Sequence, residues 1–352
     1  MPTHKFFGFS LYLSTFAAQC PALRGQAGTG TPVFLSLHIS EEFGPDYCRR
    51  AEEICSQLKE WGYRIIADVS GKTLRQFGCG ELTELASRLG LWALRIDYGF
   101  TVEQMGEMAE KMPIVINAST VSAADAARIA SRGSEVYAMH NFYPRPETGL
   151  DEELLTERTK ALQNAGLKVL AFIPGDTLRR GPLFEGLPTL EEHRNILPSA
   201  AFADLCVRFG IDGVFVADPG ISETERGRIR RYCEADVISI PAELRDGYER
   251  FYDRVFTCRA DSPRWLIRFQ ESREYSCKGE TIKPENCVSR NVGSITIDNE
   301  KYGRYTGEVQ LIRKDLPADD RVNVIGQVVP EAGLLLPLIR GGQKFTLVRP
   351  KE

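Results

Sequence analysis

The segment KVLAFIPGDTLRRGPLFEGLPTLEEHR (168–194) contains a short strand followed by a long loop. Its first residues, KVLAF (168–172), are apolar and β-prone, whereas the remainder intersperses glycine and proline with acids and arginines. Such a loop cannot continue a strand and is too long for a minimal strand-to-helix connection. Long ordered loops usually carry function. We therefore expect a functional loop here, with a surface insertion as the alternative.

Similar strand-like runs recur along the first two thirds of the chain, and most precede a polar turn and a helical pattern. The runs cover 6–13, 33–39, 64–69, 93–97, 114–117, 135–140, 168–172 and 213–218. The helical patterns between them cover 47–61, 80–89, 102–111, 122–131, 151–165 and 190–209. This alternation predicts an α/β fold, a (β/α)8 TIM barrel. An open doubly wound sheet is disfavoured because no glycine-rich phosphate fingerprint follows the first run.

The pattern changes after residue 254. Residues 236–254 read as a last strand-like piece and a connecting helix, and six short strands with hardly any helix signal follow. These strands are expected at 255–259, 265–269, 294–297, 307–313, 322–324 and 345–348. We thus predict a catalytic barrel at 1–240, a connecting segment at 241–254 and a small all-β domain at 255–352.

Composition limits the classes of partner. The chain of 352 residues has a net charge of −4 and no basic block, so neither nucleic acid nor an anionic membrane is an expected partner. No run approaches the roughly 20 apolar residues of a membrane-spanning helix, and we read 6–18 as containing a buried first strand rather than a signal sequence. The nine cysteines are scattered without a CxxC pair, which favours reduced thiols and a cytoplasmic location.

Polar side chains occupy the ends of almost all barrel strands, where a TIM barrel keeps its chemistry. Loops are polar by default, and Asp68 and Asp218 could instead cap helices. The candidates, in chain order, are Ser36, His38, Glu41, Asp68, Ser70, Arg95, Asp97, Asn117, Ser119, His140, Asn141, Tyr143, Arg145, Glu185 and Asp218.

Two of these carboxylates suit glycoside hydrolysis. Asp97 ends the fourth strand and Glu185 lies in the loop after the seventh, with Phe184 and Leu187 expected to exclude water. The fourth and seventh strands lie on opposite sides of a barrel, so the two carboxylates can face a scissile bond from opposite sides. We assign both as catalytic. A structural ion pair of Asp97 with an arginine is the alternative.

Other chemistries fit less well. A metal site is disfavoured because the histidines are not closely spaced, and a Schiff base because no strand ends in lysine. We expect no cofactor. The arginines after the sixth and seventh strands favour an anionic substrate: Arg145, Arg179, Arg180 and Arg194.

Several motifs resemble one family across essentially the whole chain. They are SLHISEE (36–42), LRIDYGF (94–100), INAST (116–120), HNFYPRPETGL (140–150), GPLFEGLPTLEEHR (181–194), RNVGSITIDNEKYGRYTGEVQL (290–311) and RVNVIG (321–326). In these the chain is similar to the bacterial 6-phospho-N-acetylmuramidases. An additional stretch, AQCPALRGQAGTG (18–30), looks like an insertion after the first strand.

The resemblance implies a TIM barrel joined to a cyclophilin-like β-barrel. It also implies hydrolysis of the β-1,4 bond between 6-phosphorylated N-acetylmuramic acid and N-acetylglucosamine, during cytoplasmic recycling of cell-wall sugars. The family does not supply a settled catalytic pair, so Asp97 and Glu185 rest on the reasoning above. The expected substrate-binding residues are His38, Glu41, Asn117, His140, Asn141, Tyr143, Arg145, Arg194 and Asp218.

The sequence also allows two other functions, one enzymatic and one not. A phosphosugar isomerase or aldolase would use the same barrel, and a sugar-phosphate-binding protein would bind without turnover. The β domain either contributes residues to one rim of the cleft or serves as a passive folding or dimerisation module. The sequence is therefore also compatible with a homodimer.

Overall fold

The computed structural model describes residues 5–37, 44–133, 135–272 and 281–350. The chain forms two compact units. The first contains Met1–Pro198 and Leu205–Ser222, and the second contains Ser199–Asp204 and Glu223–Glu352. The predicted α/β fold class, a barrel and a separate sheet domain, is confirmed, while the boundaries placed at 240 and 255 stay predictions.

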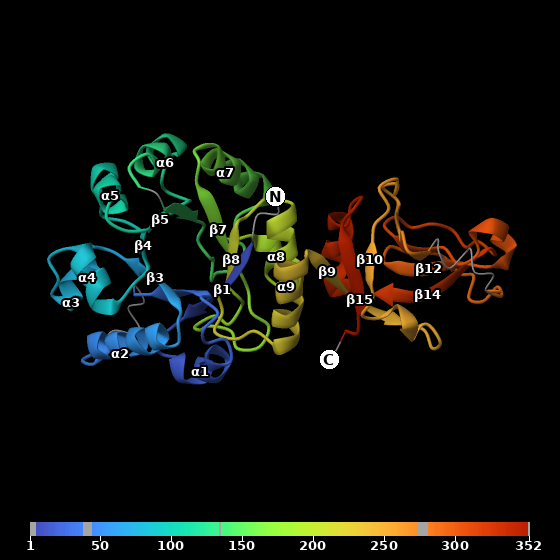
Figure 1. The fold of residues 1–352 in the computed structure, drawn as a ribbon, viewed down its shortest axis with the longest axis horizontal. Coiled ribbons are helices and arrows are strands. Elements are labelled where there is room, and N and C mark those ends of the chain that lie inside the picture. The colour runs from blue at the N-terminus through green and yellow to red at the C-terminus, as the bar shows by residue number, and fades with distance from the viewer. Residues whose placement is uncertain (1–4, 38–43, 134, 273–280, 351–352) are drawn as a thin grey trace. The chain divides into compact units, whose positions relative to one another are not determined.

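The strands of the first unit form a closed parallel barrel in the order β1 to β8, coloured from blue to yellow-green in Figure 1. Closure is made by β1, where Phe9 pairs with Val33 on one side and Val216 on the other. Because all strands are parallel, their carboxyl ends meet at one rim. The strands are β1 (Phe6–Leu11), β2 (Pro32–Ser36), β3 (Arg64–Val69), β4 (Ala93–Ile96), β5 (Ile114–Asn117), β6 (Val136–Met139), β7 (Lys168–Ile173) and β8 (Gly213–Val216).

Helices follow the strands, and Figure 1 shows α2 to α7 around the outside of the barrel. Several begin at side-chain caps: Ser70 accepts a hydrogen bond from the Lys72 amide, and Asp151 accepts one from the Leu154 amide. The helical segments are α1 (Phe16–Arg24), α2 (Tyr47–Glu60), α3 (Gly71–Phe77), α4 (Leu82–Leu89), α5 (Val102–Ala109), α6 (Ala123–Ala130), α7 (Glu152–Asn164), η2 (Glu191–His193) and α8 (Pro198–Val207).

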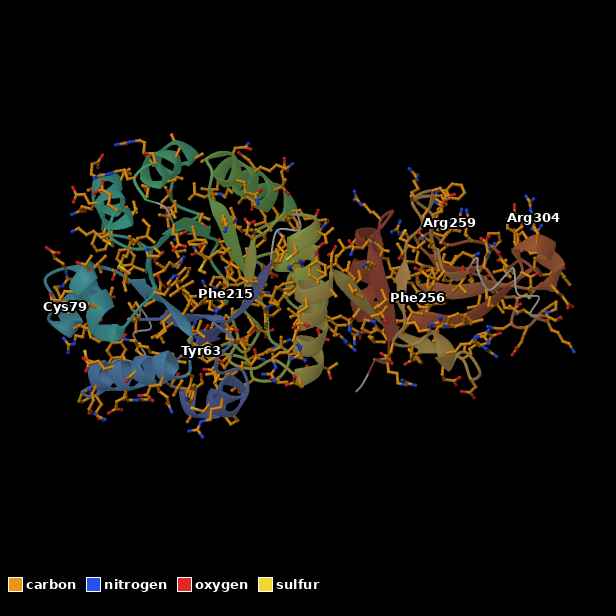
Figure 2. The ribbon with its side chains drawn as sticks, viewed as in Figure 1. Tyr63, Cys79, Phe215, Phe256, Arg259 and Arg304 are labelled. Atoms are coloured by element: carbon orange, nitrogen blue, oxygen red, sulfur yellow. The ribbon has the colours of Figure 1, made fainter. Side chains whose placement is uncertain are left out.

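Large aromatic side chains fill the barrel interior. The Phe172 ring lies 5.2 Å from that of Phe34 and 6.0 Å from that of Phe215, and Figure 2 shows Phe215 among the barrel strands. All three side chains are almost fully buried. Their packing gives the rim a rigid base, which matters because catalytic groups must hold their positions closely.

The second unit contains a seven-stranded sheet in the order β10-β15-β9-β14-β12-β13-β11. Its aromatic core includes Phe256, Phe269 and Phe345, and the Phe269 ring lies 4.8 Å from both others; Phe256 is labelled in Figure 2. The elements are α9 (Glu223–Ala235), β9 (Val237–Leu244), η3 (Glu249–Phe251), β10 (Val255–Thr257), β11 (Leu266–Arg268), β12 (Ser294–Asp298), η4 (Glu300–Tyr305), β13 (Val309–Ile312), β14 (Val322–Val328), η5 (Pro330–Leu338) and β15 (Lys344–Val348).

Several local features were not expected from the sequence. The first residues of the stretch interpreted as an insertion, 18–30, belong to α1, whose Pro21 obscures the helical pattern. The continuous helix expected at 190–209 is instead η2 followed by α8. The strand expected before the connecting helix, β9, pairs with β14 and β15 in the second sheet. None of the described helices is long and apolar enough to cross a membrane.

Candidate active site

Arg95 organises the polar groups at the rim of the barrel. Its side chain is only 4% exposed, and its Nη1 lies 2.8 Å from Asp68 Oδ1 and 3.5 Å from Asp97 Oδ1. Its Nη2 donates a short hydrogen bond to Asn141 Oδ1. A buried guanidinium is tolerated only when it is paired. Arg95 therefore brings side chains from the ends of β3, β4 and β6 to one centre.

Asp97 is fixed by one of its two carboxylate oxygens. Asn117 Nδ2 donates to Asp97 Oδ1 over 2.7 Å, and the Ser119 amide donates to Asn117 Oδ1 over 2.8 Å, which sets the orientation of the amide. The Asp97 side chain is 30% exposed. Its Oδ2 makes no hydrogen bond to any residue that the structure describes. One oxygen is thus anchored, and the other is available to a substrate.

The segment after β6 is tied to the loop after β7. The Tyr143 amide donates to Pro188 O over 2.9 Å, and Thr189 Oγ1 donates to Asn141 O over 2.9 Å. The Tyr143 hydroxyl lies 3.5 Å from Ser119 Oγ. The structure therefore brings together Asp97, Asn117, Asn141 and Tyr143 from the predicted set.

Arg194 holds the backbone of these two segments. Its Nε and Nη2 donate to both oxygens of Glu191, over 2.6 and 2.7 Å. Its Nη1 donates to Gly186 O over 2.9 Å, and Nη2 also reaches Tyr143 O at 3.1 Å. The Arg194 cation lowers the pKa of Glu191 to about 2. With its donors engaged in this way and the residue 6% exposed, Arg194 shapes the loop.

Asp218, after β8, accepts hydrogen bonds from three backbone amides of the same loop. Its Oδ2 accepts from the amides of Gly175 at 2.9 Å and Leu187 at 3.2 Å, and its Oδ1 accepts from the Arg180 amide at 2.9 Å. Burial raises its pKa above the usual value, although the three amides oppose this effect. Asp218 has no exposed surface, so it supports the loop from below.

Glu185 lies between those anchors with an exposed side chain. Its own carbonyl is 3.5 Å from Arg194 Nη1, and Gly186 follows with a φ of 81°, a conformation that favours glycine. The expected exclusion of water is met only in part, because Leu187 is buried whereas Phe184 is 59% exposed. Leu187, and not Phe184, belongs to the core cluster of the barrel.

Arg180 provides a cation at the rim. Its guanidinium lies 4.7 Å from the centre of the Tyr12 ring and 5.8 Å from that of Phe142. Its side chain forms no hydrogen bond or ion pair with a described residue, so the aromatic rings alone hold it. The sequence placed Arg180 among the loop cations but not in the predicted binding set. The only signal was the Arg179-Arg180 pair within a glycine-rich loop.

His140 lies beneath the rim. Its Nε2 is 3.0 Å from Thr159 Oγ1, and it has no exposed surface. Burial, with a smaller effect from Arg158, lowers the pKa of His140 from 6.5 to about 4. A neutral, buried imidazole supports the packing of β6 against α7.

The remaining predicted residues are placed as follows. His38 and Glu41 lie outside the described residues. Arg145 is exposed, and its backbone carbonyl accepts from Thr148 Oγ1 over 2.6 Å. The sequence named Asp68 and Arg95 as strand-end candidates, but neither was among the expected catalytic or substrate-binding residues. The structure shows that the Arg95 guanidinium contacts both Asp68 and Asp97. Across the described ranges, no group of three histidine, cysteine, aspartate or glutamate residues could hold a metal ion.

Comparison with known proteins identifies the family. Residues 7–231 match "6-phospho-N-acetylmuramidase, N-terminal", and residues 238–348 match "6-phospho-N-acetylmuramidase, C-terminal". The chain belongs to the 6-phospho-N-acetylmuramidase family. The resemblance seen in the sequence is thereby confirmed, and the chain is a glycosidase by family.

Two solved structures resemble this chain over nearly its whole length. A conserved Enterococcus faecalis protein of unknown function is 36% identical, with a TM-score of 0.83 over 98% of this chain and 97% of that one. An uncharacterized B. cereus protein is 24% identical, with a TM-score of 0.80 over 98% of this chain and 100% of that one, which shows the shared fold. No curated protein matches this 6-phospho-N-acetylmuramidase family member.

Proposed function

We propose that this protein hydrolyses the β-1,4 bond between N-acetylmuramic acid 6-phosphate and N-acetylglucosamine. The observation that carries the proposal is the Asp97 carboxylate, whose Oδ1 is held by Asn117 and Arg95 while its Oδ2 is available at the barrel rim. A carboxylate oriented by rigid strands is the central requirement of glycoside hydrolysis.

Asp97 and Glu185 are the proposed catalytic pair. Glu185 protonates the glycosidic oxygen as the bond to the muramic acid C1 breaks, and N-acetylglucosamine leaves as the alcohol. Asp97 acts on the opposite face. It either attacks C1 or directs water to it, or it orients the 2-acetamido group whose carbonyl oxygen attacks C1. In each route water finally supplies the hydroxyl on C1 and a proton.

Arg180 is the proposed phosphate contact. Its cation lies over Tyr12 and Phe142 without a carboxylate partner among the described residues, whereas Arg194 is already engaged with Glu191 and carbonyl oxygens. A guanidinium offers the donor geometry that phosphate oxygens fit. Arg145, exposed after β6, is the proposed second phosphate contact.

The proposed setting is the recycling of cell-wall sugars in the cytoplasm. It is supported by the family match and by the cysteines, which are all free thiols where the structure describes them. The substrate is a phosphorylated amino-sugar disaccharide, which needs neither nucleic acid nor a membrane for recognition.

The test is incubation of the purified protein with that disaccharide and, separately, with its unphosphorylated form, followed by chromatography of released N-acetylglucosamine. The expected result is release from the phosphorylated substrate alone. Equal cleavage of both compounds, or binding of the phosphorylated compound without cleavage, contradicts the proposal. The anomer formed first, followed by NMR, distinguishes retention from inversion.

A further inference from the structure

We propose that the second domain carries a binding site of its own for the phosphomonoester of a small organic molecule. The site is a cavity of 650 Å3 at the β11 and β13 edge of the sheet, beside η5. Arg264, Arg313 and Arg340 line it. This site lies entirely within the second unit and does not depend on the function proposed for the barrel.

The charge lining the cavity is of one sign. Three arginines contribute to the wall, and no aspartate or glutamate does. Among acids close to the wall along the chain, Asp261 pairs with Arg259 over 2.8 Å, and Asp315 Oδ1 accepts from the Val292 amide over 2.8 Å. Because like charges near each other raise the free energy of the folded protein, an arrangement of this kind is stabilised by a bound anion.

Arg313 is the most informative of the three. Its Nε donates to Leu336 O over 2.9 Å, which fixes the guanidinium against η5. Its Nη2 is buried and has no hydrogen-bond partner among the described residues. Burial lowers the pKa of Arg313, and the nearby Arg340 cation lowers it further. Leaving a buried N–H donor without an acceptor costs free energy. A ligand that supplies an acceptor for Arg313 would remove this cost.

Arg264 and Arg340 are exposed and make no ion pair with a described residue. Some other arginines of the domain are neutralised by carboxylates, as Arg268 is by Glu308 at 2.7 Å and Arg321 by Asp319 at 2.8 Å. The guanidinium donors of Arg264 and Arg340 are therefore available to an anion in the cavity.

A second cavity provides a contrast. It measures 570 Å3 and lies along α9, and its arginines alternate with acids of the same wall. Among them, Arg349 Nη1 lies 3.8 Å from Asp253 Oδ2. Charges there are compensated within the protein. In the cavity beside η5, by contrast, no acidic side chain of the wall compensates the arginines, so a bound anion would do so.

The class of ligand follows from charge and size. Several guanidinium groups match the oxygens of a phosphomonoester dianion. The cavity falls within the range of about 300–1,000 Å3 that is typical of small-molecule sites, which is larger than a phosphate ion requires. Val292, Leu336 and Pro337 supply apolar surface for an organic body attached to the phosphate.

Trp265 gives a local signal for binding. It follows Arg264 in the chain, its carbonyl accepts from the Arg313 amide over 2.8 Å, and its side chain is 47% exposed. The other tryptophans of the sequence, Trp61 and Trp92, belong to the barrel. Labelling the full chain with 5-fluorotryptophan yields separate 19F NMR signals, and a Trp265→Phe variant assigns the one beside the cavity.

The experiment titrates the full chain with glucose 6-phosphate, inorganic phosphate and glucose, in separate series. We expect glucose 6-phosphate to shift the Trp265 signal saturably and glucose to leave it unchanged. Arg264→Ala and Arg340→Ala should each weaken binding at least about tenfold, as expected for a lost charge-assisted hydrogen bond. The matched control, Lys344→Ala, removes an exposed cation of the same domain outside the cavity and should bind like the wild type.

A further variant adds an anion to the cavity wall. A Cβ at Gly333 would meet no atom within 4 Å, so the backbone there accepts a side chain, and Gly333→Asp should abolish binding. The proposal is overturned if glucose 6-phosphate leaves the Trp265 signal in place, or if the arginine variants bind like Lys344→Ala. Equal affinity for inorganic phosphate and glucose 6-phosphate would exclude an organic ligand.

Discussion

Asn117 Nδ2 lies 2.7 Å from Asp97 Oδ1, the carboxylate oxygen that also faces Arg95. Two donors on one oxygen set the carboxylate plane and leave the other oxygen to the barrel rim. The Asn117 amide is in turn held by the Ser119 backbone. Exposure distinguishes Asp97 from Asp68 and Asp218, because the Asp97 side chain is 30% exposed whereas the other two residues are buried.

Asp97→Asn should lower kcat on the phosphorylated disaccharide by at least ~100-fold, the low end of general acid-base effects. Folding should be nearly unchanged, because asparagine can still accept through one oxygen. Single-turnover kinetics and thermal unfolding measure the two effects. The matched control is Asp246→Asn, at an exposed turn of the second domain. Turnover near the wild-type level would redirect the assignment to Asp218, Asp68 or Glu41.

Glu185→Gln should reduce the chemical step by a similar factor of at least ~100, because the amide cannot protonate the leaving oxygen. Since Glu185 is exposed, the stability of the protein should not change. A substrate with a more acidic leaving group needs less protonation and should recover much of the lost rate. Equal losses on both substrates would contradict a role as the acid. Glu157→Gln, on the exposed face of α7, is the control.

Arg180→Ala should raise KM for the phosphorylated disaccharide by about tenfold or more, as expected for a lost charged hydrogen bond. Any residual cleavage of the unphosphorylated disaccharide should be unaffected. The ratio of kcat/KM for the phosphorylated over the unphosphorylated disaccharide should therefore fall. Arg180→Lys keeps the charge and should recover part of the affinity. Arg179→Ala is the neighbouring control. An equal effect of Arg180→Ala on both substrates would show that the residue acts on folding of the rim.

His140→Gln should change how stability depends on pH. Burial lowers the pKa of His140 from 6.5 to about 4, so the wild-type contribution is fully present above pH 6.5 and is lost as pH falls towards 4. The loss should amount to roughly 3 kcal/mol, on the scale of 1.36 kcal/mol for each pKa unit. Urea unfolding of both proteins from pH 7 to pH 4 measures the difference. A constant difference across that range would contradict the expectation.

The strands were predictable because apolar, β-prone runs alternate with helical patterns, and a closed barrel places their ends at one rim. Burial of polar residues was not predictable. The sequence gives no sign that Arg194 pairs with Glu191 and contacts the Gly186 carbonyl, or that Asp218 accepts from backbone amides of the loop after β7. Conversely, Arg180 becomes distinctive only once Tyr12, from a distant part of the chain, lies against it.

Two fixed points bound the tip of the loop after β7. The Arg180 amide is held by Asp218, and the Gly186 carbonyl is held by Arg194. Between them, residues 181–185 include the exposed side chains of Leu183 and Phe184. Substitutions there leave both anchors in place. With Glu185 kept, we expect substitutions of Leu183 and Phe184 to change which sugars the protein accepts without loss of the barrel, so directed evolution of specificity can start at these two exposed side chains.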